Sequence, residues 1–251
     1  MKFYNYGSKD LPAVMLIHGG GNSKWMFERA AELMKDRYYM ILPELDGHGE
    51  EREITYISTK EEAGKIIRYI DENLGGRLFC IAGASLGSQI AMEILAQKPR
   101  EIENAFLESG IYRPKKITAK MMSWKWLIGA MEKMYRWKWL VKLQCKYSGW
   151  PVEIAEKIAA DAMAVSSESN YNLYRTYFNY ELPESLQKVT GSVLLICGSK
   201  ESGMIKKDIR YAAARIAGSE TDVFDGVGHC GCSLGNPTAY TDKLLRFLES
   251  S

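Results

Sequence analysis

The 251-residue sequence lacks the usual marks of a membrane-spanning or secreted protein. No apolar run approaches the ~18 residues that a membrane-spanning helix needs. The first ten residues contain no continuous apolar stretch of the kind found in signal peptides. The five cysteines are odd in number and scattered among apolar neighbours, which indicates reduced thiols rather than a disulfide framework. Together with the initiator methionine, these features lead us to expect a cytoplasmic protein.

Motifs for metals and nucleotide cofactors are also missing. His229 is followed by Cys230 and Cys232, but a closed zinc site usually needs a fourth ligand and wider spacing. The early glycine-rich loop has Lys24 where a dinucleotide fingerprint would have its third glycine, and no Gly-Lys-Ser/Thr follows. We therefore expect neither a metal nor another cofactor.

Apolar segments alternate with helical patterns along the chain, as in a doubly wound α/β sheet. The length suits one sizeable core, and the net charge is only +2. Strands are predicted at residues 14–17, 38–42, 78–82, 105–107, 193–197 and 220–224. Helices are predicted at residues 60–74, 87–98, 206–217 and 237–248.

The sequence Gly83-Ala84-Ser85-Leu86-Gly87 is the most informative motif, because it joins a predicted strand to a predicted helix. At such a sharp turn the serine hydroxyl is forced outward, and flanking glycines avoid collisions between a Cβ and neighbouring backbone. The following helix directs its positive end at the serine, and the Leu86 amide is free to bind an oxyanion. The motif predicts a nucleophile elbow, whereas the plain alternative is a chance pattern in a small-residue turn.

A serine nucleophile needs a base, and His229 is the best placed of three histidines. It lies in a glycine-rich loop between the last predicted strand and the last helix, from which an imidazole can reach across the sheet. Glu201 follows the strand at residues 193–197 and is the candidate acid that orients this imidazole. Glu108, at the end of the preceding predicted strand, is the competing acid.

His18-Gly19-Gly20-Gly21 follows the first predicted strand and supplies the remaining part of the predicted site. Consecutive glycines let backbone amides approach a substrate oxygen closely. Gly20 is the expected second oxyanion donor and Gly21 the alternative, in contact with substrate. We expect His18 to be structural.

These landmarks, together with Asp46-Gly47-His48-Gly49 after the second predicted strand, make the chain resemble the α/β-hydrolase superfamily, specifically small serine esterases and lipases with a helical cap. The resemblance implies an eight-stranded, mostly parallel sheet flanked by helices, although the short N-terminus leaves little room for the first edge strands. It implies Ser85 as nucleophile, His229 as base and Glu201 as acid, where aspartate is the usual residue. It also implies a core at residues 1–112 and 183–251, interrupted by a cap at 113–182.

The expected cap is rich in tryptophan and basic residues. Residues 113–146 contain ten Lys or Arg and a single acid, Glu132, which gives a net charge of +9. Three interpretations stay open: a helical cap with solvated lysines, a cap shaped for an anionic or lipid-like substrate with an apolar body, and contact with an acidic membrane surface. Trp126 is the predicted substrate contact. No nucleic-acid-binding fold is recognisable, so we expect no nucleic-acid partner.

The sequence thus predicts a carboxylesterase-like serine hydrolase that cleaves a carboxylic ester with an apolar acyl or alcohol part, through an acyl-enzyme on Ser85. A noncatalytic small-molecule receptor remains the alternative from another class. An acyltransferase, thioesterase or lyase would use the same residues.

Overall fold

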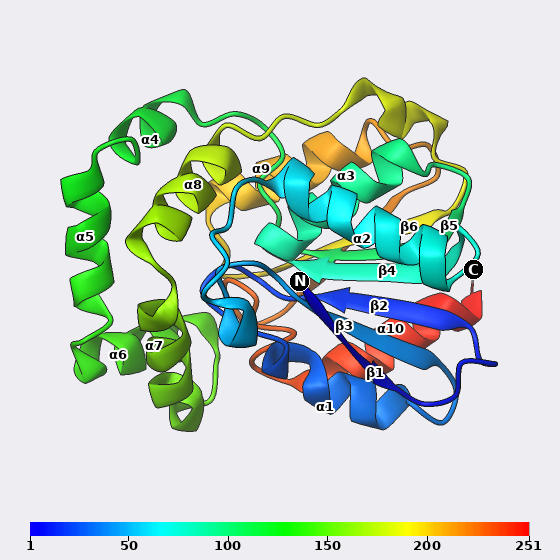
Figure 1. Ribbon diagram of the computed structural model, residues 1–251, viewed down its shortest axis with the longest axis horizontal. Helices are drawn as coiled ribbons and strands as arrows, with labels where there is room; N and C mark the ends of the chain where they lie inside the picture. The colour runs from blue at the N-terminus through cyan, green and yellow to red at the C-terminus, as the bar shows by residue number, and fades with distance from the viewer. Residues whose placement is uncertain (251) are drawn as a thin grey trace.

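A central mixed sheet organises the computed structural model, which describes residues 1–250 (Figure 1). Its strands are β1 Lys2–Tyr6, β2 Ala13–Ile17, β3 Tyr39–Glu44, β4 Leu78–Ala84, β5 Ile102–Glu108, β6 Ser192–Gly198 and β7 Glu220–Phe224. Within the described range they form one seven-stranded sheet in the order β1-β3-β2-β4-β5-β6-β7. Strand β1 runs antiparallel to β3, and the other neighbours are parallel. The α/β-hydrolase fold expected from the sequence is therefore present.

The six predicted strands all occur, whereas β1 was not predicted. The resemblance implied eight strands, and residues 1–250 form seven. A single strand, β1, precedes β2 in the described residues, so one antiparallel edge strand lies beyond β3. Strand β1 combines three aromatic side chains with the polar Lys2 and Asn5, and this edge strand is only partly buried.

Helices cover both faces of the sheet. Helices α1 Trp25–Met34 and α10 Pro237–Ser250 lie on one face, while α2 Thr59–Asn73, α3 Leu86–Gln97 and α9 Gly203–Ala213 lie on the other (Figure 1). Short 3-10 turns occur at η1 Gly49–Glu51, η2 Val152–Ile154 and η3 Glu184–Lys188. The four helices predicted from the sequence correspond to α2, α3, α9 and α10.

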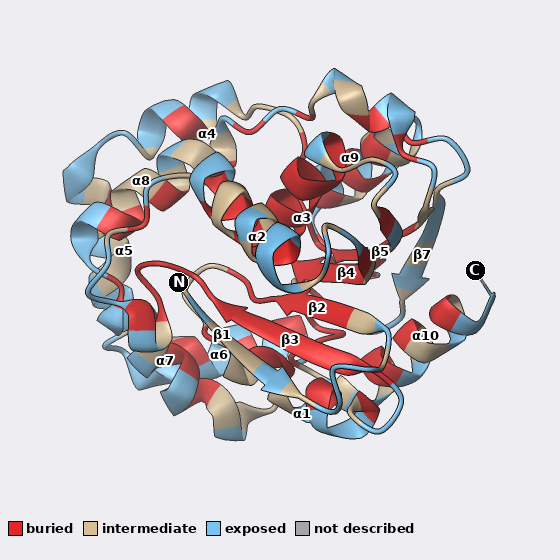
Figure 2. Ribbon diagram, turned by 45° about the vertical axis from the view of Figure 1, so that its right-hand side comes forward, coloured by how far each residue is buried: buried red, intermediate tan, exposed pale blue. Residues whose placement is uncertain are grey.

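The core has two halves, because side chains of the buried strands alternate between the faces of the sheet. In β2, Met15 and Ile17 pack on the α2, α3 and α9 side, whereas Val14 and Leu16 pack on the α1 and α10 side. Figure 2 shows β3 buried along its length and β2 buried except at its first residue. The five cysteines are all buried and free, as predicted.

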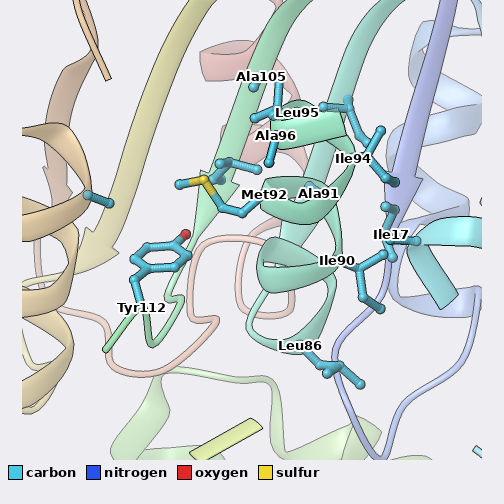
Figure 3. Packing of buried hydrophobic residues seen from close by; sticks show 14 of the residues in the cluster. Ile17, Leu86, Ile90, Ala91, Met92, Ile94, Leu95, Ala96, Ala105 and Tyr112 are labelled. Atoms are coloured by element: carbon cyan, nitrogen blue, oxygen red, sulfur yellow. The ribbon is translucent and has the colours of Figure 1, made fainter. Parts of the chain in front are cut away.

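Helix α3 is the most enclosed helix in this arrangement, with every residue from Leu86 to Ala96 buried. Figure 3 shows Ile90 and Ile94 beside Ile17 of β2, in the same apolar cluster. The helix therefore holds its N-terminal end, directly after Ser85, in a fixed position against the sheet.

Five further helices lie between β5 and β6, outside the sheet layers (Figure 1). They are α4 Lys116–Met121, α5 Lys125–Met134, α6 Lys138–Ser148, α7 Ala155–Ala164 and α8 Ser167–Phe178. We call them the inserted helices. They face loops that follow the carboxyl ends of β2, β4, β5, β6 and β7, with which they enclose a pocket.

Candidate active site

Ser85 occupies the turn between β4 and α3 in an uncommon backbone conformation, with φ 54° and ψ −111°. A side chain in this region of positive φ costs roughly 1–3 kcal/mol and persists only where surrounding structure enforces it. The enforcing contacts include the Ser85 amide, which donates to the Glu108 carbonyl at 2.8 Å, and the start of the buried helix α3. The strained turn holds the serine hydroxyl at the carboxyl edge of the sheet.

The flanking glycines are required by close backbone contacts, as predicted. A Cβ on Gly83 would lie 2.4 Å from the Gly87 carbonyl oxygen, and a Cβ on Gly87 would lie 2.1 Å from the Ile17 carbonyl oxygen. Both distances are far below van der Waals contact, so only glycine permits this strand-to-helix packing.

His229 lies in the loop after β7 and joins the serine to a carboxylate. Its Nε2 is 3.0 Å from Ser85 Oγ, and its Nδ1 is 3.2 Å from Glu201 Oε1. Because a carboxylate only accepts hydrogen bonds, we assign the neutral-ring proton to Nδ1, which leaves Nε2 to accept from the serine hydroxyl. The structure thus brings together the three residues that the sequence predicted for these roles.

Glu201 follows β6 and is almost completely buried. Its Oε1 also accepts a short hydrogen bond from the Ser109 hydroxyl, and Ser109 Oγ accepts from the Cys230 amide at 3.3 Å. Ser109 therefore ties the carboxylate to the loop that carries His229. Sequence reasoning missed this residue, since a serine after a strand has no distinctive local pattern.

Glu108, the competing acid, has different partners. Its carboxylate accepts from the backbone amides of Cys232 at 3.0 Å and Ser233 at 3.3 Å. Burial raises the pKa of Glu108 to about 7, although these donors oppose the shift. Glu108 thus anchors the loop after β7, whereas the ring of His229 bonds to Glu201.

Backbone strain is concentrated here. Within residues 1–250, positive φ at non-glycine positions occurs at Ser85, Ser109 and Cys230. Each is a member of the hydrogen-bonded group just described or adjoins one. Such clustering is typical of sites where geometry is fixed for chemistry rather than for stability.

The charge state of His229 reflects opposing influences. Burial alone disfavours imidazolium and lowers its pKa, but the Cys230 sulfur and the Glu201 carboxylate outweigh burial and raise the pKa well above 6.5. The side chain remains 37% exposed, so solvent can reach the ring. The site can therefore hold a proton on this imidazole after removing it from a neighbouring hydroxyl.

The backbone amides of Gly20 and Leu86 border the same pocket and have no hydrogen-bond acceptor within residues 1–250. Leu86 is the first residue of α3, where an amide has no partner inside the helix. Gly21 also lines the pocket and has φ 71°. These amides form a donor-rich edge beside Ser85 that could receive a negatively charged oxygen.

The pocket has a volume of about 310 Å³, at the small end of the range for ligand sites. Most lining side chains are apolar or aromatic, including Ile111, Trp150, Leu173 and Phe178. The lining contributed by residues 1–250 contains no lysine or arginine. The basic side chains of the inserted helices thus do not supply a cation to this cavity.

Trp126 does not line the pocket. It lies on the outside of α5, where its ring stacks on Trp124 with centroids 6.0 Å apart. The prediction that Trp126 contacts the substrate was therefore wrong, because the sequence does not show which face of α5 turns toward the pocket.

Tyr177 on α8 is a pocket residue that the sequence analysis missed. Its hydroxyl lies 3.2 Å from Ser85 Oγ, and its main-chain carbonyl accepts from the Gln89 side chain at 3.0 Å. Burial raises the pKa of Tyr177 far above its usual value, so the phenol stays protonated and can donate. When the His229 ring is neutral, the serine proton is directed at its Nε2, and Tyr177 donates to the serine oxygen.

His18 is buried and structural. Its Nδ1 donates to the Gly19 carbonyl at 2.9 Å, and its Nε2 accepts from the Leu45 amide at 3.2 Å. Burial lowers its pKa to about 3, so the ring is neutral.

Across residues 1–250, no cluster of three or more His, Cys, Asp or Glu suited to a metal ion is found. In the same range, no helix is both long and apolar enough to cross a bilayer.

The chain matches a known protein family and is similar to several known proteins in sequence or in structure. Residues 14–242 match a family model described as "Alpha/beta hydrolase family". The chain is 28% identical over 98 residues to the uncharacterized hydrolase YugF of Bacillus subtilis, a match covering 39% of this chain and 36% of that protein. Similar structures include an esterase from Exiguobacterium antarcticum, with a TM-score of 0.79, 19% identity and coverage of 98% and 94% of the two chains. The enol-lactonase from Burkholderia xenovorans gives a TM-score of 0.80, 14% identity and coverage of 99% and 96%. At these identities the structural similarities establish the fold alone.

Proposed function

We propose that this chain, which belongs to the alpha/beta hydrolase family, is a serine hydrolase that cleaves a carboxylic ester. Family membership supports hydrolase activity in general. The observation that carries the finer proposal is the continuous series from Ser85 Oγ through the His229 ring to Glu201, at 3.0 and 3.2 Å. A hydroxyl, a base and an orienting carboxylate in this order are what nucleophilic acyl transfer needs.

In the proposed reaction, Ser85 Oγ attacks the ester carbonyl while His229 Nε2 takes the serine proton. The amides of Leu86 and Gly20 donate to the resulting oxyanion. His229 then protonates the departing alcohol, which leaves an acyl group on Ser85. Water, deprotonated by His229, attacks this acyl-enzyme, and the acid is released as Ser85 regains its proton. Glu201 orients the ring and stabilises its charged form throughout.

The pocket favours a neutral substrate with a small or medium apolar acyl group. Its walls are mainly apolar, its volume is about 310 Å³, and Glu132 is the one carboxylate that residues 1–250 contribute to its lining. An anionic group would meet no lysine or arginine there and would be desolvated at a cost. The proposed substrate is therefore less polar than the basic inserted segment alone suggested.

A series of p-nitrophenyl esters of increasing acyl length tests this proposal. We expect turnover to be highest for short and medium chains and to fall once the chain exceeds the pocket. Ser85→Ala should lose this turnover by several orders of magnitude. Equal hydrolysis by wild type and Ser85→Ala would contradict the proposal. Product analysis with an added alcohol distinguishes hydrolysis from acyl transfer, which uses the same residues.

A further inference from the structure

Helix α6 exposes an apolar stripe that nothing in the described chain covers. Trp139, Leu143 and Tyr147 are spaced four residues apart and share one side of the helix. They are 65%, 55% and 68% exposed, respectively. Val141 and Cys145 form the opposite, buried side. The helix is therefore anchored by one apolar face and presents a second one outward.

Helix α5 repeats this pattern with Trp126 and Met134, two turns apart and both exposed. Figure 1 shows α4, α5 and α6 following one another along the outer edge of the molecule, and Figure 2 shows exposed surface on α5. We call the exposed apolar side chains of this edge the outer face. Its members are Ile117, Met121, Trp124, Trp126, Met134, Trp137, Trp139, Leu143 and Tyr147.

Basic side chains surround the outer face. The exposed ones in this segment are Lys116, Lys120, Lys125, Lys133, Arg136, Lys138, Lys142 and Lys146. Within residues 1–250, only one of these eight, Lys138, forms an ion pair with a carboxylate, that of Glu156. The outer face thus combines exposed aromatic rings with positive charge that the protein itself leaves largely uncompensated.

We propose that the outer face docks on an anionic phospholipid surface. Tryptophan and tyrosine rings favour the boundary between headgroups and acyl chains, and adjacent lysines are attracted to anionic headgroups. A second copy of this face fits less well, because symmetric pairing would bring two segments of the same strong positive charge together. A nucleic acid would satisfy the lysines but leave Ile117, Leu143 and Met134 without an apolar phase.

The outer face also adjoins the pocket. A groove of about 470 Å³ between α5 and α6 is lined by Met134, Leu143 and Tyr147, which belong to the outer face. Tyr135 and Gln144 line both this groove and the pocket that contains Ser85. Docking would therefore place a lipid surface next to the site without requiring any part of the chain to cross the bilayer.

Cosedimentation with vesicles tests the proposal directly. The probe is an equimolar mixture of phosphatidylglycerol and phosphatidylcholine, compared with phosphatidylcholine alone. We expect binding to the anionic vesicles, weakened by added salt because salt screens the charges. Five of the six tryptophans lie at residues 124–150, so a blue shift in intrinsic fluorescence should accompany binding. Absence of binding to anionic vesicles at low salt would overturn the proposal.

Two variants locate the binding surface. The triple variant Lys133→Gln, Arg136→Gln, Lys142→Gln should weaken vesicle binding by about 100-fold, at about fivefold per removed charge. The double variant Trp139→Gln, Leu143→Gln should weaken it and make the remaining binding more sensitive to salt. Circular dichroism and thermal melting verify that each variant is folded.

A matched control removes the same charge elsewhere. Lys9, Lys60 and Lys188 are exposed and lie outside the inserted helices, so replacing all three by glutamine should leave vesicle binding close to wild type. Equal losses in the control and the first triple variant would show a general charge effect and overturn the assignment. The docking proposal would also be overturned if the outer-face variants bound vesicles like wild type but lost oligonucleotide binding or self-association.

Vesicle binding and ester turnover are separate readouts. Ser85→Ala should lose turnover of a soluble ester yet bind anionic vesicles like wild type. Failure of the docking proposal therefore leaves the proposed function testable on its own.

Discussion

Replacing Glu201 by glutamine should greatly reduce turnover while preserving the fold. The change removes the negative charge 3.2 Å from His229 Nδ1 but keeps nearly the same shape. A pair of unit charges ~4 Å apart gains about 4 kcal/mol at an effective dielectric constant of about 20. The ring is 37% exposed, and solvent screening reduces this gain to roughly 3 kcal/mol. Since about 1.4 kcal/mol corresponds to a tenfold change in rate, we expect kcat to fall about 100-fold.

The assay compares kcat and KM on the best ester of the acyl series, with Glu108→Gln as the matched control. Glu108 is a buried glutamate at the same edge of the sheet, but its carboxylate accepts from the backbone after β7. Its replacement should lower the melting temperature and leave kcat close to the wild-type value. KM should change little in Glu201→Gln, because this carboxylate does not line the pocket. Near-normal kcat in Glu201→Gln, with a large loss in folded Glu108→Gln, would refute the reasoning and exchange the roles of the two acids.

Three further results are expected. Only the neutral ring of His229 can act as base, and its pKa is raised above 6.5, so kcat/KM should fall as the pH drops through that raised pKa. Glu201→Gln should move this acidic fall in kcat/KM to lower pH, and a fall at the same pH would argue against an effect of Glu201 on the pKa of His229. Tyr177→Phe should lower kcat about fivefold because it removes one hydrogen bond to Ser85, while KM and the melting temperature change little. Stopped-flow kinetics that show an unchanged kcat would exclude this positioning role. Gly87→Ala should reduce the free energy of unfolding by about 3 kcal/mol or more, since its Cβ would lie 2.1 Å from a backbone oxygen of β2. A urea titration that gives the wild-type free energy of unfolding would contradict this packing argument.

The sequence predicted the parts of the molecule whose causes are local. Buried strands were recognisable from short apolar runs, and the turn at Ser85 from glycines that the backbone contacts require. His229 could be placed because a loop after a late strand reaches the carboxyl edge of the sheet. Strand β1 escaped prediction because an edge strand lacks a continuous apolar run.

Residues that depend on distant packing could not be predicted in the same way. Tyr177 lies 92 positions after Ser85 and meets it only because α8 folds back over the sheet. Ser109 contacts Glu201 across the same sequence separation. For Trp126, composition indicated an aromatic inserted segment, but the inward face of α5 is decided by its neighbours rather than by its own pattern.

The most direct test of the central proposal is intact-protein mass spectrometry after exposure to a fluorophosphonate. We predict one covalent adduct per chain, mapped by peptide analysis to Ser85, absent in Ser85→Ala and strongly slowed in His229→Ala. A folded wild-type protein that forms no adduct would contradict the account and favour a noncatalytic receptor. An adduct that persists in Ser85→Ala would show that the nucleophile lies elsewhere.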